Sequence, residues 1–154
     1  MSMEVLVFSD RRLRSMSEWQ RAIDSERLGI VLPADSSIDE LHGYLPLHHY
    51  GKNTGFECHH YDAAEMMAFC QGVSFGHPWT QCLCFIWGGN FDEALAAYMA
   101  SAAYAKAAEG IVYEPEDGVI MLPREALDAA RRFEDELPKL KQIVVDAVKK
   151  LSAG

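Results

Sequence analysis

The sequence predicts a single α+β domain, spanning residues 1–154, with one mixed or mainly antiparallel sheet and helices packed on it. Three observations predict this fold class. The 154 residues are enough for one domain with a real core. Apolar residues make up 49% and charged residues 24%, which is the balance of a globular protein. Strand-like and helix-like segments follow one another in a mixed order that includes two hairpins.

The N-terminal part predicts a strand followed by a helix. Residues 3–9 (MEVLVFS) form a short, mostly apolar segment with several branched side chains, which is typical of a buried strand. A helix is predicted next, with Ser15 or Ser17 as its N-cap and Gly29 closing it.

A second strand and a short helix are predicted before the first hairpin. The strand GIVLP is stopped by Pro33. The helix has the capping-box spacing from Ser37 to Glu40, and Gly43 ends it.

Residues 44–62 (YLPLHHYGKNTGFECHHYD) predict a hairpin whose turn is GKNTG, residues 51–55. Because side chains alternate across a strand, the second half of this hairpin has two distinct faces. The packed face is predicted to carry Phe56, Cys58 and His60, and the more exposed face Glu57, His59 and Tyr61.

The middle of the chain predicts a short helix, a loop and the central strand. Asp62 is a good N-cap for the helix, and a loop-like stretch follows it. Residues 80–89 (TQCLCFIWGG) contain the most apolar strand of the chain, which we expect at the centre of the sheet.

The clearest helix is predicted over residues 90–110, where Asn90 caps the start and Gly110 stops the end. Its many alanines would allow it to lie close against the sheet. The residues expected to pack on the central strand are Leu95, Tyr98 and Ala102.

The C-terminal part predicts a second hairpin and a last helix. The hairpin, residues 111–122, turns at PEDG. The helix begins at Pro123 and is expected to break or kink near Pro138. Its last apolar residues are compatible with core packing or with a partner-binding face, and they span too few heptads for a coiled coil on their own. These residues are Leu140, Ile143, Val144, Ala147, Val148 and Leu151.

Charge and hydropathy exclude several classes of protein. The net charge of −9 argues against binding nucleic acid, which requires clustered Lys and Arg. No apolar run approaches the ~20 residues that span a bilayer. The N-terminal stretch lacks the features of a secretion signal, so we expect a cytoplasmic protein with reduced cysteines and no membrane association.

All six histidines lie between His42 and His77, and Cys58, His59 and His60 are consecutive. Three consecutive residues of a strand cannot all face one ion, and the chain has none of the usual zinc-ligand spacings. We therefore expect no metal and no cofactor. No catalytic residue is assigned, because no signature loop or nucleophile elbow is present.

Three stretches carry a family resemblance: GYLPLHHYGKNTGFE (43–57), IWGGNFDEALAAYMASAAYAKAAEG (86–110) and GIVYEPEDG (110–118). Together they resemble small bacterial α+β proteins, some of which are similar to immunity proteins that neutralise the toxin of a polymorphic-toxin or type VI secretion locus. The resemblance implies a cytoplasmic, non-enzymatic inhibitor of one protein partner. The acidity of the chain would suit a basic toxin domain.

Contacts with such a partner are expected from acidic turns and from the exposed face of the first hairpin. These residues are Asp39, Glu40, Glu57, His59, Tyr61, Glu114, Glu116 and Asp117. Two alternatives remain open. One is a small-molecule-binding domain or enzyme with the His-rich region 42–77 lining its pocket. The other is a structural oligomer, and a homodimer is compatible with either.

Overall fold

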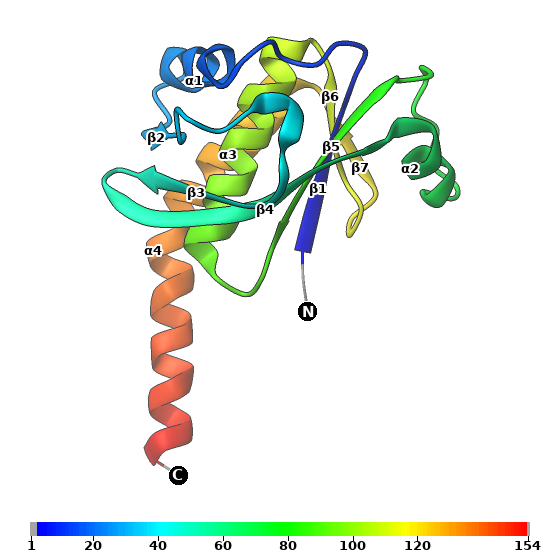
Figure 1. Cartoon of the computed structure of the whole chain (residues 1–154). Coiled ribbons are helices and arrows are strands. Elements are labelled where there is room, and N and C mark those ends of the chain that lie inside the picture. The colour runs from blue at the N-terminus through cyan, green and yellow to red at the C-terminus, as the bar shows by residue number, and fades with distance from the viewer. Residues whose placement is uncertain (1–2, 154) are drawn as a thin grey trace.

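A computed structural model describes residues 3–153 and shows a seven-stranded antiparallel sheet with four α-helices, which confirms the α+β class (Figure 1). The strands are β1 (Met3–Ser9), β2 (Ile30–Val31), β3 (His42–His49), β4 (Lys52–Asp62), β5 (Gln81–Trp87), β6 (Ile111–Glu114) and β7 (Val119–Met121). The helices are α1 (Met16–Ser25), α2 (Ala63–Phe69), α3 (Phe91–Ala108) and α4 (Pro123–Ala153).

The strand order is β2-β3-β4-β5-β1-β6-β7, and every neighbouring pair is antiparallel. β5 is the fourth of the seven strands, so the prediction that residues 80–89 contain the central strand is confirmed. Its apolar composition follows from burial on both faces. Leu83 and Phe85 belong to the core on one face, and Cys82 and Cys84 to the core on the other.

The two faces of the sheet are covered unequally. Helices α1, α3 and α4 contribute to the large core on one face, which we call the helical face. The other face is covered only in part, by α2 and the loop that follows it, and we call it the open face. The unequal cover leaves polar side chains of the open face in contact with solvent.

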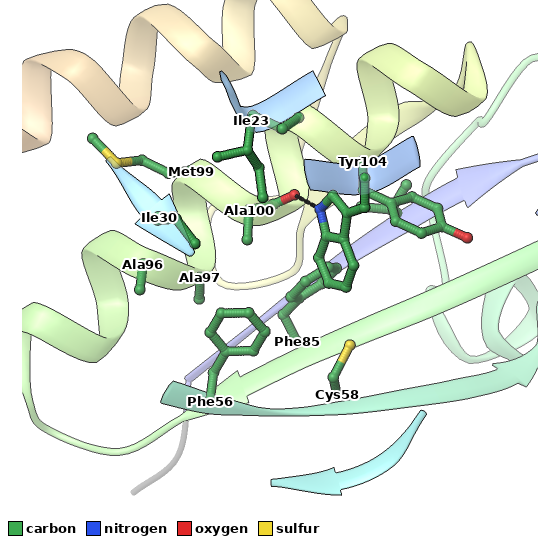
Figure 2. Close-up of a cluster of buried hydrophobic side chains, with 14 of the residues drawn as sticks. Ile23, Ile30, Phe56, Cys58, Phe85, Ala96, Ala97, Met99, Ala100 and Tyr104 are labelled. Atoms are coloured by element: carbon green, nitrogen blue, oxygen red, sulfur yellow. Dashed lines mark hydrogen bonds between the residues drawn. The ribbon is translucent and has the colours of Figure 1, made fainter. Parts of the chain in front are cut away.

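The helical-face core is centred on Trp19 of α1. Its side chain is fully buried, and its ring packs edge-on against Phe85 at 5.9 Å and Tyr104 at 5.4 Å between ring centroids. The indole Nε1–H donates to the carbonyl oxygen of Ala100 at 3.0 Å, the dashed line in Figure 2. The small side chains of Ala96 and Ala100 let α3 lie close to the sheet.

Sequence signals at the helix starts are confirmed. Ser15 caps α1 by accepting from the backbone N–H of Glu18 at 3.1 Å. Asp62 caps α2 in the same way. Asn90 caps α3 by accepting from two backbone N–H groups. Each cap satisfies a donor that the first helical turn leaves unpaired.

The predicted turn of the first hairpin is wrong. The connection between β3 and β4 is the two-residue turn Tyr50–Gly51, and the segment 52–55 already belongs to β4. Both turn residues have positive φ, 49° and 80°, as a two-residue hairpin turn of this type requires. The Tyr50 ring stacks on His49, with ring centroids 4.6 Å apart.

The start and end of two other elements also differ from prediction. Helix α1 ends at Ser25 rather than at Gly29, because Arg27 already adopts the left-handed conformation. The predicted short helix is a single 3₁₀ turn, Ile38–Glu40, and Gly43 lies inside β3 rather than closing a helix.

Of the predicted break or kink near Pro138, the break is wrong, because α4 runs as one helix from Pro123 to Ala153 with Pro138 inside it. A proline removes one backbone hydrogen bond. Contacts on both sides of it hold the helix: Leu137 is buried, and the Lys141 ammonium lies 2.8 Å from the Asp92 carboxylate. Beyond this ion pair α4 projects away from the sheet, so its last apolar residues do not pack on the core (Figure 1).

Because Gly110 has no side chain, the backbone after α3 can lie close to the backbone of β1. A Cβ at this position would overlap the carbonyl oxygen of Phe8 and lie 2.9 Å from the Ser9 Cβ. Gly110→Ala is therefore expected to lower the free energy of unfolding by about 1–3 kcal/mol. Gly89→Ala is the matched control, since a Cβ there meets nothing within 4 Å. Equal denaturation midpoints for the two variants would contradict this packing.

Among residues 3–153, no helix combines the length and the apolar character that crossing a bilayer requires.

Candidate functional site

The candidate site is the uncovered part of the open face, where four strands present side chains in register. Directly paired residues of antiparallel strands project to the same face. The pairings Tyr44–Glu57, Glu57–Ile86 and Ile86–Glu4 therefore form one row across β3, β4, β5 and β1. The row sets two carboxylates on either side of one aliphatic residue.

A second row runs parallel to the first. His42 pairs with His59, His59 with Cys84, Cys84 with Leu6, and Leu6 with Tyr113. Its His42 end is exposed and His59 is half-buried, whereas Cys84, Leu6 and Tyr113 are buried in the open-face core. We call the first row, together with His42, His59 and Tyr61, the open-face site.

The tyrosines of the site are well exposed. Tyr44 exposes 57% of its surface and Tyr61 40%. The Tyr44 ring lies over Gly55, whose missing side chain makes room for it: the hydroxyl is 2.5 Å from where a Cβ would be. A large aromatic surface with a polar tip, held against a strand, is typical of protein interfaces.

The two histidines of the second row are held together. The Nδ1 atoms of His42 and His59 are 3.1 Å apart, so one ring donates and the other accepts. His59 also stacks on Tyr61, with ring centroids 5.7 Å apart, and its Nε2 lies 3.6 Å from the Glu57 carboxylate. These contacts fix the orientation of the side chains in the cluster.

A groove of about 700 Å³ borders the site beside α2. Glu4, Tyr61, Phe69 and Tyr113 are among the residues that line it. The Cys84 thiol donates to the Glu4 carboxylate, with 3.7 Å between sulfur and oxygen.

The groups in and beneath this groove are not primed for nucleophilic chemistry. Burial raises the pKa of the Cys84 thiol and raises the pKa of Cys82 to about 12, so both stay protonated at neutral pH. Burial also raises the pKa of Tyr61 and Tyr113, which remain hydrogen-bond donors. Neither of these two thiols is therefore poised as a nucleophile.

The structure places the eight predicted contact residues in three locations. Glu57, His59 and Tyr61 share the open face, as the strand alternation predicted, since Phe56 and Cys58 are buried on the opposite face. The remaining five lie in two other places. Asp39 and Glu40 belong to the 3₁₀ turn, whereas Glu114, Glu116 and Asp117 lie at the β6–β7 hairpin.

The acidic residues at these two other locations differ from those of the open-face site in their partners, their burial and their position in the sheet. Asp39 is paired with Arg12 at 3.6 Å. Glu114 is half-buried, and burial, with the neighbouring Asp117 and Glu116 carboxylates, raises its pKa. β6 is three strands away from β4, or about 14 Å at the usual strand spacing.

Sequence reasoning missed Glu4, Tyr44, Ile86 and Tyr113. Glu4 could have been identified from the sequence, because it is the only charged residue of the mostly apolar strand β1. Tyr44 and Tyr113 offered none, since which tyrosines share a face depends on the pairing of strands that are distant in the sequence.

Two of the other histidines, His49 and His60, have structural partners. His49 and His60 each place Nε2 near a backbone carbonyl oxygen, of Leu28 at 3.0 Å and of Ile38 at 2.8 Å. Burial lowers the pKa of both, so they are neutral at pH 7. Within residues 3–153, no three His, Cys, Asp or Glu side chains are placed to hold a metal ion together.

No protein-family model, curated protein or solved structure gives a significant match to this chain.

Proposed function

We propose that this chain is a non-enzymatic protein-binding protein, and that its partner docks on the open-face site. The main observation that supports this proposal is the row Tyr44–Glu57–Ile86–Glu4. It is an uncovered sheet surface that combines two carboxylates with an exposed aromatic ring. Exposed aromatic and aliphatic surface supplies affinity in protein interfaces, and charged residues at its margin supply selectivity.

The partner is expected to present basic residues to this surface. The net charge of −9 attracts a cationic protein from a distance, and Glu4 and Glu57 would pair with its Lys or Arg side chains. The resemblance to immunity proteins supports a cytoplasmic inhibitor of a bacterial toxin. A basic toxin domain that this chain neutralises is thus the partner that we propose.

Co-expression with the product of the adjacent gene tests this function. The wild-type chain is expected to relieve the toxicity of that product, and Glu57→Lys is expected to abolish the relief because it places a cation in an anionic contact surface. Glu116→Lys, in the β6–β7 turn, is the matched control and is expected to protect like the wild type. An adjacent gene product that is harmless alone would contradict the inhibitor, and loss of protection in Glu116→Lys only would place the partner elsewhere.

The groove beside α2 favours a second candidate, the binding of a small cationic or hydrogen-bonding molecule. Its volume falls in the range of ligand pockets, and Glu4 with two tyrosine hydroxyls would supply the polar contacts. Glu57→Lys distinguishes the two functions, because Glu57 does not line the groove. If a small ligand is bound there, its affinity should change little in Glu57→Lys and should fall by more than tenfold in Glu4→Gln.

A further inference from the structure

Two imidazole rings face each other across β3 and β4. His42 and His59 are directly paired residues of these antiparallel strands, so both side chains project to the open face. Their Nδ1 atoms are 3.1 Å apart. His42 is exposed, and the side chain of His59 is 13% exposed. The two nitrogens are therefore close to each other and accessible from solvent.

The distance between these nitrogens matches that of two ligands on one metal ion. A metal–imidazole bond is about 2.0–2.1 Å long. Two such bonds that meet at about 90–110° place their nitrogens about 2.8–3.4 Å apart. The Nδ1–Nδ1 distance of 3.1 Å lies inside this range. Both rings could thus reach one ion by small side-chain rotations, without any change in the strands.

Glu57 lies where a metal-binding imidazole usually has a hydrogen-bond acceptor for its second nitrogen. Its Oε1 atom is 3.6 Å from His59 Nε2. A carboxylate at this position favours the tautomer of His59 with the proton on Nε2, which leaves the Nδ1 lone pair free to bind an ion. The arrangement is that of the carboxylate–histidine–metal triads of known metal sites.

The backbone and one neighbouring ring hold the pair in place. The ladder of β3 with β4 runs from the pair His42–His59 to the pair His49–Lys52, so the strands fix the spacing of the two ligands. The His59 ring also stacks on Tyr61 at an interplanar angle of 22°. Ligands that are already ordered lose little conformational entropy when an ion binds.

We propose that His42 and His59 form a two-histidine site for a divalent transition-metal ion, bound through both Nδ1 atoms. Imidazole nitrogens suit Cu²⁺, Ni²⁺ and Zn²⁺, whereas Mg²⁺ and Ca²⁺ prefer oxygen ligands. The remaining coordination positions of the ion are open to water. Binding replaces the hydrogen bond between the two rings, and the proton of the donor Nδ1 moves through solvent to the Nε2 of the same ring.

The expectation of no metal came from Cys58, His59 and His60, which are neighbours in one strand. That reasoning does not apply to His42, which is 17 residues away from His59 in the sequence and meets it only through strand pairing. The exposed His48 provides a contrast, because it lies opposite Asn53 and so offers a single imidazole.

Isothermal titration of the full chain with NiCl₂ tests the proposal. Cys70→Ser is the background, because Cys70 is only half-buried whereas the other three thiols are buried. We expect one Ni²⁺ per chain, and we expect His42→Ala and His59→Ala each to weaken binding at least tenfold. His48→Ala is the matched control and should bind like its parent. Equal affinity in His42→Ala and His48→Ala, or no Ni²⁺ binding by the parent, would overturn the proposal.

Nitrogen chemical shifts identify the ligands without any substitution. In long-range ¹H–¹⁵N spectra of the imidazole rings, Zn²⁺ is expected to shift the Nδ1 signals of His42 and His59 and to leave their Nε2 atoms protonated. Zn²⁺-induced shifts at His48 or His77 in place of these two would overturn the site. Binding of Mg²⁺ as tight as that of Ni²⁺ would also overturn it, because the ligands would then be carboxylates.

Glu57→Gln tests the contribution of the carboxylate beside His59. We expect it to weaken Ni²⁺ binding by about tenfold, because it removes the group that orients the imidazole. Glu116→Gln removes the same charge at the β6–β7 hairpin and should leave the affinity unchanged. Equal affinities in the two variants would overturn the role of Glu57. None of these measurements involves the proposed protein partner, so the metal site and the proposed function are tested separately.

Discussion

Replacing Phe85 by alanine is expected to lower the free energy of unfolding by about 3–5 kcal/mol. Phe85 is fully buried in the central strand, where its ring contacts Trp19 at 5.9 Å and Phe56 at 5.3 Å between centroids. Removing the ring opens a cavity between α1 and the sheet that close packing cannot fill without distortion. Urea denaturation followed by tryptophan fluorescence measures the change.

Ile86→Ala is the matched control for this prediction. Ile86 is the next residue of the same strand, but it projects to the open face and is only partly buried. We expect a loss of about 1 kcal/mol, because part of its surface is already in water. Equal losses in the two variants would contradict the assignment of Phe85 to the helical-face core.

Replacing Glu26 by glutamine is expected to destabilise the chain by about 2–3 kcal/mol at pH 7. Glu26 is 8% exposed at the end of α1, and its carboxylate lies 2.7 Å from Lys106 of α3 and 2.7 Å and 3.0 Å from Arg124 and Arg131 of α4. The neutral amide leaves three cations facing one another. The expected loss is below that of a fully buried ion pair, because the cations are about half exposed.

The effect of Glu26 should depend on pH in a defined window. Hydrogen bonds from Arg124 and Lys106 lower the pKa of Glu26 from 4.5 to about 2. A lowered pKa in the folded state stabilises the fold above the unfolded value, and this contribution disappears as the pH falls from about 4.5 to 2. The difference between wild type and Glu26→Gln should therefore shrink across that interval. Asp24→Asn removes a charge from the same helix end at an exposed site, and it should change stability by less than about 0.5 kcal/mol at every pH.

Local sequence patterns predict most of the helices and strands. They do not predict which residues of different strands become neighbours, because strand pairing is non-local. The apolar run 82–87 indicated the central strand because burial on both faces leaves no place for polar residues. The alternation in 56–61 identified which side chains face solvent. Glu4, however, meets the row of Glu57 only through β5, and no local pattern encodes that register.

The wrong turn prediction and the undecided role of the last apolar residues of α4 also reflect non-local contacts. Both Tyr50–Gly51 and the stretch 51–55 contain turn-forming residues, and the ladder of β3 with β4 selects the first. The spacing of Leu140, Val144 and Leu151 revealed an apolar face of a helix, but periodicity does not say what covers such a face. Only the arrangement of α4 relative to the sheet shows that this face is exposed.

The most direct test of the open-face site is the association rate constant of this chain with the product of its adjacent gene, measured at low and high salt. For the wild type we expect the rate to fall at least tenfold as salt rises, because anionic residues steer the encounter. For Glu57→Lys we expect slow association at low salt and a weaker salt dependence. An association rate constant that does not depend on the salt concentration, or one that is the same for Glu57→Lys and the wild type, would contradict binding through this surface.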